Sequence, residues 1–136
     1  MSAMSAVRNF LLAAVLGAVS ASASAEWTLV VKDDKIYAAF ADKDSIRKRG
    51  HMSVMHGMYD FPRQDFTPEG KGLFSTAVLR EYDCKGRRVR LLSAIDFSGH
   101  MGAGTAVSTI DTPRRWEDVV EGSIDEAFWK IACGVN

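Results

Sequence analysis

The sequence predicts an α+β fold, an antiparallel sheet of about six strands with one carboxy-terminal helix packed on it and tethered by a disulfide. Three observations lead to this prediction. Apolar and polar residues alternate with a period of two through most of residues 27–110, and a helical pattern is found only near the end of the chain. The chain also holds two cysteines, Cys84 and Cys133, and it begins with an export signal.

Residues 1–25 predict a secretory signal peptide. Arg8 supplies a basic start, an apolar run covers residues 10–19, and small residues end at Ala23-Ser24-Ala25, which are the three parts of such a signal. The run is shorter than the ~20 residues that a membrane-spanning helix needs, so we expect no membrane span. We expect export through the Sec pathway to the periplasm, the cell surface or the medium, with residues 26–136 as a single mature domain.

The strands are expected in order along the mature chain, each bounded by turn residues. The alternating segments are residues 27–31, 35–41, 52–61, 73–84, 87–97 and 105–110. Asp33-Asp34 marks the first turn, and Lys85-Gly86 predicts a hairpin between two of the strands. Residues 42–51 are expected to be a charged connection, and residues 62–72, with two prolines and two glycines, are expected to be a loop.

The segment 87–97 carries an apolar face and a basic face if its alternation is unbroken. The residues expected on the apolar face are Val89, Leu91, Ile95 and Phe97, with Arg88 and Arg90 opposite them.

Residues 122–134 change to a helical period. Ser123 and Glu126 form the S-x-x-E pattern of a capping box, in which each side chain is expected to bond the other residue's amide. Gly134 is placed to end the helix.

One stripe of this helix, formed by Ile124, Phe128 and Ile131, is expected to face the core. Cys133 falls about 180° from Ile124 at ~100° per residue. Either the last turn unwinds or the buried arc is broad, and both arrangements permit a bond back to the sheet.

Cys84 and Cys133 are expected to form a disulfide, because they are the only cysteines and an exported chain meets an oxidising compartment. A metal site would need more Cys or His at ligand spacing, and a catalytic thiol would need a general base that no motif marks. The bridge would close a loop of about 50 residues, which stabilises the fold by roughly 4 kcal/mol in the chain-entropy treatment.

The order of these segments resembles the surface-adhesin protein E family of Gram-negative bacteria. The resemblance covers roughly Trp27 to Cys133 and is firmest at the Y-x-C motif of residues 82–84, at "GAGT" and at the closing "FWKIAC". It implies a six-stranded sheet bridged to the carboxy-terminal helix, adhesion to host extracellular matrix proteins or plasminogen, and the capacity to form a homodimer. The chain departs from the name-giving member in having no cysteine near the cleavage point for a lipid anchor.

A basic cluster follows Cys84 and is the candidate ligand-binding site. Its residues are Lys85, Arg87, Arg88 and Arg90. Such a patch can hold an acidic partner, although charged side chains at hairpin tips and edges also serve only to keep strands from aggregating. A second basic run covers residues 46–51. Once Arg8 is removed with the signal, the mature chain is almost neutral, which argues against a general nucleic-acid binder.

Two other functions are alternatives. A copper-binding protein would use the Met/His segment 51–58, with His56 and Met58 as ligands, but Met52 and His56 would lie ~13 Å apart along a strand. A soluble periplasmic structural or stress protein is the other alternative. Catalysis is not expected, because no G-x-S-x-G or phosphate-binding motif accompanies Asp96, Ser98 and His100. No cofactor is expected either.

Overall fold

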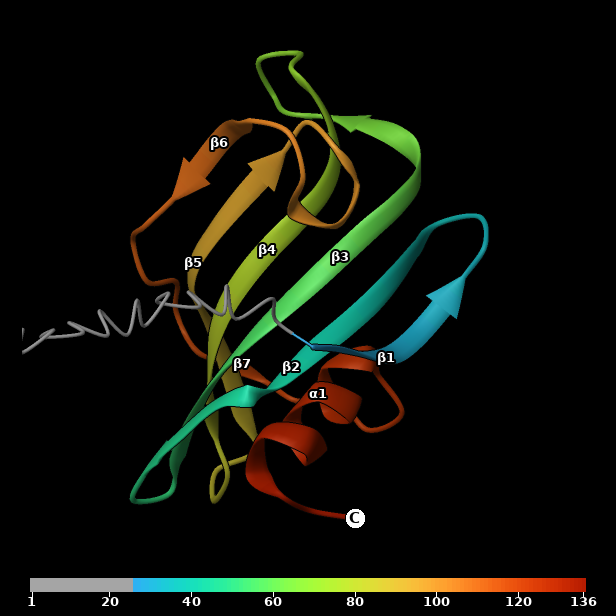
Figure 1. Cartoon of the computed structure of the whole chain (residues 1–136). Coiled ribbons are helices and arrows are strands. Elements are labelled where there is room, and N and C mark those ends of the chain that lie inside the picture. Colours follow the sequence, from blue (N-terminus) through green and yellow to red (C-terminus); the bar gives the residue numbers. More distant parts are fainter. Residues whose placement is uncertain (1–25) are drawn as a thin grey trace, which may run out of the picture.

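Strands β1 to β6 lie side by side in chain order, and every pairing is antiparallel (Figure 1). The computed structural model describes residues 26–136, so the expected signal peptide lies outside the described residues. The strands are β1 (Trp27–Asp33), β2 (Tyr37–Arg49), β3 (Met52–Phe66), β4 (Gly72–Asp83), β5 (Arg88–Phe97) and β6 (Ala106–Ile110), with a two-residue β7 (Glu117–Asp118) paired to β5. The predicted fold class is confirmed.

Parts of two segments expected to be connections are strands instead, and only residues 50–51 and 67–71 of them are turn or loop. β2 continues to Arg49 and turns only at Gly50, which has a φ of 61°, because a register shift between Asp42 and Arg47 lets the charged stretch stay paired with β3. β3 likewise passes through Pro62 and ends at Phe66. Pro62 is tolerated because it lies in a break of the β3–β4 register, where no ladder amide is required.

A β-bulge interrupts β5. Its pairing with β4 shifts between Leu79 and Arg80, which leaves Leu92 as an extra residue. An extra residue reverses the alternation of side chains beyond it. The side chains that face the helix before the bulge are Val89 and Leu91, and the opposite face holds Arg88, Arg90, Ile95 and Phe97. The prediction of one continuous apolar face is therefore wrong for Ile95 and Phe97.

Helix α1 (Ile124–Cys133) has the predicted caps, with one difference. The Ser123 hydroxyl accepts from the Glu126 amide at 3.2 Å, and Gly134 ends the helix with a φ of 67°. The Glu126 carboxylate accepts from the amide of Gly122 at 3.3 Å rather than from that of Ser123. The Ser123 amide is already bonded to the carbonyl oxygen of Val120.

The core lies between α1 and the sheet. The residues in it are Ala39, Ala41, Met55, Tyr82, Val89, Val119, Phe128, Trp129 and Ala132. Phe128 and Trp129 are neighbours on the helix and both are buried, so the buried arc is broad and Cys133 reaches the sheet without any unwinding. β3 comes close to its neighbours at Gly57, where a Cβ would lie 3.1 Å from the Val78 side chain and 3.4 Å from the Phe128 ring.

The disulfide joins Cys84 to Cys133 with a Cα–Cα distance of 5.5 Å, as predicted. Beside it, the Trp129 indole donates to the carbonyl oxygen of Asp83 at 2.9 Å, and the Ser53 hydroxyl donates to that of Ala132 at 2.7 Å. The last two turns of α1 are therefore fastened to the tip of the β4–β5 hairpin by the disulfide and the Trp129 bond, and to β3 by the Ser53 bond.

Candidate functional site

The two basic runs of the sequence meet at one end of the sheet. The β2–β3 turn and the β4–β5 turn are adjacent, because Met52 pairs with Asp83 and the Cys84 amide donates to the His51 carbonyl oxygen at 2.8 Å. Figure 1 shows both turns at the same end of the molecule as the carboxy-terminal end of α1. We call this region the basic end; its exposed residues are Arg47, Lys48, Arg49, His51, Lys85 and Arg87.

Arg87 points toward the helix. Its guanidinium lies 2.6 Å from the Glu126 carboxylate and stacks over the Trp129 ring, 4.7 Å from the ring centroid. Arg87 has a φ of 51°, the left-handed conformation that a tight turn after Gly86 requires. It therefore serves the packing of the tip against α1, and its charge is balanced locally.

Arg88 and Arg90 lie on the face of the sheet away from α1. Arg88 pairs with Asp83 at 2.8 Å and Arg90 pairs with Glu81 at 2.7 Å. The Trp116 ring lies against both guanidiniums, with centroid distances of 5.0 Å and 4.7 Å. These two arginines hold the segment before β7 on the sheet, and each is balanced by a carboxylate.

Asp83 organises the hairpin tip from a buried position, 4% exposed. Its carboxylate accepts from Arg88 and from the backbone amides of Lys85 and Gly86. These bonds, that from Arg88 first and that from Gly86 next, lower the pKa of Asp83 against the opposing effect of burial. The tip is thus rigid and its acid stays ionised.

Four Lys and Arg side chains of the basic end have no acidic partner in the described part of the chain. Within residues 26–136, no ion pair is found for Arg47, Lys48, Arg49 or Lys85. Arg47 bonds backbone oxygens of its own turn, and Lys48 donates to the Cys133 carbonyl oxygen at 3.4 Å. The run 46–51, which the sequence marks less strongly than the cluster after Cys84, therefore carries most of the unbalanced charge. The sequence could have indicated this, because Asp83 and Glu81 lie opposite Arg88 and Arg90 across the hairpin and neutralise them.

A hollow of about 490 Å³ opens beside the basic end, on the face away from α1. It is lined by Arg47, Lys48, Arg49, Met52, Val54 and Glu81. Its lining combines three cations with two apolar side chains and one carboxylate. Glu81 is already bonded to Arg90, so the hollow presents net positive charge above an apolar floor.

The copper candidates share a strand face but not an environment. His56 is exposed, whereas Met58 is 4% exposed, because the short 3-10 turn η1 (His100–Gly102) covers it, with Gly102 close to the Met58 methyl group. Met55 faces the core on the opposite side. No group of three His, Cys, Asp or Glu side chains that could hold a metal ion is found within residues 26–136. Copper binding by His56 and Met58 stays an untested alternative.

The side chains that a catalytic triad would require have separate partners. His100 bonds Asp60 at 3.2 Å, the Ser98 hydroxyl accepts from the Thr105 amide at 2.9 Å, and Asp96 accepts from the Thr76 hydroxyl at 2.6 Å. These bonds fasten η1 and its flanking residues to the sheet. The described residues also contain no helix long and apolar enough to cross a membrane.

An antiparallel sheet in chain order, closed by a disulfide to one carboxy-terminal helix, defines the class of this domain. The family described as surface-adhesin protein E matches residues 27–134, and the chain belongs to that family. The family is one of adhesins, in agreement with the resemblance of the sequence.

Solved structures of Haemophilus influenzae protein E share this fold. Crystal form II of Haemophilus influenzae protein E is 13% identical with a TM-score of 0.62, and the match covers 79% of this chain and 87% of that one. Protein E from non-typeable Haemophilus influenzae is 12% identical with a TM-score of 0.60, over 78% of this chain and 74% of that one. At such identities the likeness is one of fold alone. No curated protein matches the chain.

Proposed function

We propose that this protein is an exported, non-catalytic binding module that engages acidic surfaces of an external macromolecule through its basic end. The observation that carries the proposal is the joining of two hairpin tips, which gathers the unpaired charges of Arg47, Lys48, Arg49 and Lys85 beside the disulfide. Membership in an adhesin family supports both the binding role and the absence of catalysis. Host extracellular matrix proteins and plasminogen are the partners that the family resemblance suggests.

The construction of the basic end favours binding. The β4–β5 tip is held by Asp83, by the disulfide and by α1, and the β2–β3 tip is bonded to it through the His51 carbonyl oxygen. Little conformational entropy is therefore lost when a partner binds. Salt screens the interaction between exposed charges, and the Debye length falls from ~10 Å at 0.1 M salt to ~3 Å at 1 M salt. Binding through this surface should therefore weaken strongly as salt rises.

The unpaired cations of the basic end and the paired arginines of the β4–β5 hairpin can be separated by mutation. One variant combines Arg49→Ser with Lys85→Ser, and the other combines Arg87→Ser, Arg88→Ser and Arg90→Ser. We expect both to weaken binding to plasminogen or a matrix protein in surface plasmon resonance. The first variant should lose more per charge removed, because the three arginines are already balanced by carboxylates.

The matched control removes Arg63 and Lys71, which lie at the other end of β3 and β4. It should bind like the parent protein, and circular dichroism checks that all variants fold. Equal binding by the parent and both test variants would contradict the proposal and leave the tips as a solvated surface.

Exposure on the cell surface separates this proposal from a periplasmic structural or stress role. We expect an antibody against the folded domain to label intact cells or their medium. Signal that requires permeabilised cells would favour the periplasmic alternative. Analytical ultracentrifugation of the mature chain tests the homodimer that the resemblance implies.

A further inference from the structure

Helix α1 covers only part of its face of the sheet. It packs on β1 to β4, and a groove of about 330 Å³ lies beyond it toward β5 and β6. The apolar side chains of this groove are Tyr59, Phe61, Val78, Leu91, Ala94 and Ile110, and its polar ones are Thr76, Arg80 and Asp96. A largely apolar cavity of this size with a few polar groups is the usual form of a small-molecule site.

Arg80 lies at the inner end of the groove. Its side chain is 20% exposed, and its guanidinium stacks over the rings of Tyr59 and Phe128 at 5.3 Å and 5.9 Å from their centroids. The side chain donates to the Tyr59 hydroxyl at 2.7 Å and lies 3.4 Å from Asp125. The positive charge of Arg80 is therefore fixed against two aromatic rings, at the border between α1 and the groove.

The charge of Arg80 is only partly balanced. A guanidinium has five N–H donors, and the oxygens that surround this one belong to Tyr59, Tyr82 and Asp125. Burial is the main cause that raises the pKa of Tyr59, so its phenol is neutral. Burial raises the pKa of Tyr82 as well. Within residues 26–136, Asp125 is the one acidic residue that forms an ion pair with Arg80, and this contact is long, at 3.4 Å, and partly exposed.

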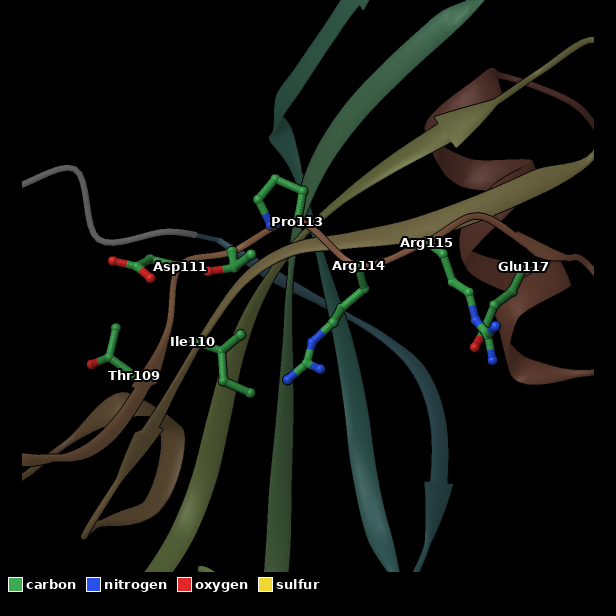
Figure 2. A pocket seen from close by; sticks show the side chains of 8 residues that line it. Thr109, Ile110, Asp111, Pro113, Arg114, Arg115 and Glu117 are labelled. Carbon is green, nitrogen blue, oxygen red and sulfur yellow. The ribbon is translucent and has the colours of Figure 1, made fainter.

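A second cavity of about 240 Å³ adjoins the groove, with Arg80 and Leu91 lining both. Its other lining residues are three arginines, two carboxylates and one apolar residue: Arg90, Arg114, Arg115, Glu117, Asp125 and Val89. The Arg114 amide donates to the Leu91 carbonyl oxygen at 2.8 Å, which fixes this segment on β5. Figure 2 shows the side chains of Ile110 and Arg114 extending to the same side of the segment. No ion pair is found for Arg114 within residues 26–136.

The groove therefore has a cationic end at Arg80 and a mainly apolar remainder, where the Asp96 carboxylate accepts from the Thr76 hydroxyl at 2.6 Å. The geometry points to a binding site for a small amphipathic carboxylate, of the class of medium-chain fatty acids. The chain would lie along Phe61, Val78 and Ile110, and the carboxylate would bond Arg80 with Arg114 nearby. This site is separate from the basic end and independent of the function proposed above.

The first test uses the unaltered protein. Titration of the 15N-labelled mature chain with decanoate, below its micelle concentration, should shift the amide resonances of Val78, Leu91 and Ala94 in a saturable way. Decanol has the same chain without the charge, and should bind at least about tenfold more weakly because a charge-assisted hydrogen bond is lost. Acetate should not bind. Shifts confined to the basic end, or none in the groove, would overturn the inference.

Three variants test the assigned ends. Arg80→Gln should weaken decanoate binding at least about tenfold and leave decanol binding little changed. Asp125→Asn should strengthen decanoate binding, because it removes the carboxylate that competes for Arg80. Ile110→Asp should weaken both ligands, since it places a charge in the mainly apolar part of the groove.

Arg63→Gln is the matched control and should bind decanoate as the parent does. If Arg80→Gln does not fold, Asp125→Asn and Ile110→Asp still decide the question. Decanoate binding that is unchanged in both of those variants would overturn the assignment.

Discussion

At the scale of single residues, the arginines of the β4–β5 hairpin show how charge is used in this domain. Arg87 and Arg88 each combine an ion pair with an aromatic ring. Exposed ion pairs alone contribute about 0–1 kcal/mol, but a guanidinium stacked on a tryptophan also buries apolar surface. These side chains hold the hairpin tip in shape, and the unpaired charges beside them remain available for a partner.

Asp83→Asn should destabilise the domain at neutral pH by about 1–3 kcal/mol, because charge-assisted bonds to a buried carboxylate are lost. The effect should depend on pH. The folded pKa of Asp83 is lowered, so the unfolded state takes up the proton first, and the stability present above pH ~4 is lost as the pH falls further. Urea unfolding of both proteins at pH 7 and pH 3 measures this. A difference in stability that is the same at both pH values would contradict it.

Copper binding is expected to be absent. Titration with Cu(I) under a competing chelator should show no tight stoichiometric site, since η1 covers Met58 while His56 is exposed. A 1:1 complex that is abolished by His56→Ala combined with Met58→Ala would reverse this expectation and favour the metal-binding alternative.

At the scale of elements, local signals place the helix well and the strand ends poorly. The cap at Ser123 and the stop at Gly134 act within one turn of the helix. The extension of β2 to Arg49 and of β3 to Phe66 depends on partners across the sheet, which a single strand's sequence does not describe. The bulge at Leu92 has the same origin, because only pairing with β4 shows which residue is extra.

Ser123→Ala should cost about 1 kcal/mol of stability, because the Glu126 amide loses its cap. Ser123→Asn is the matched control, since asparagine caps helices as well as serine does, and it should be nearly neutral. Thermal unfolding followed by circular dichroism gives both values. A loss in the asparagine variant equal to that in the alanine variant would show that capping is not the cause.

At the scale of the whole molecule, the disulfide determines how the two layers stay together. It closes a separation of 49 residues between the hairpin tip and the end of α1. The bond therefore connects the candidate binding surface directly to the helix that covers the core. A small domain gains a large part of its net stability from such a constraint.

Cys84→Ser should lower the free energy of unfolding by roughly 2–5 kcal/mol, the range for a native bridge in a small secreted domain. Denaturant unfolding with and without a reductant provides the measurement, and the parent should respond to reduction while the variant should not. Mass spectrometry of the exported protein without reduction should find no free thiol. A parent protein with the same stability in both conditions would contradict the assigned role.

The sequence by itself determined the fold class, the disulfide, the helix with its Ser123 cap and Gly134 stop, and the family. Each of these rests on a signal that acts over a short stretch or on a small count, such as the alternation of residues 35–41 or the presence of only Cys84 and Cys133. Such signals do not depend on how the rest of the chain is arranged in space.

Only the tertiary structure decided which charges are free and where a groove opens. Residues 46–51 and 85–90 are distant in sequence, and they meet because β3 and β4 pair with Met52 opposite Asp83. Arg80 lines a groove because α1 packs on β1 to β4 and leaves the sheet uncovered toward β5 and β6. The physical reason is that the balance of a charge depends on its neighbours in space, and here those neighbours come from other strands and from the helix.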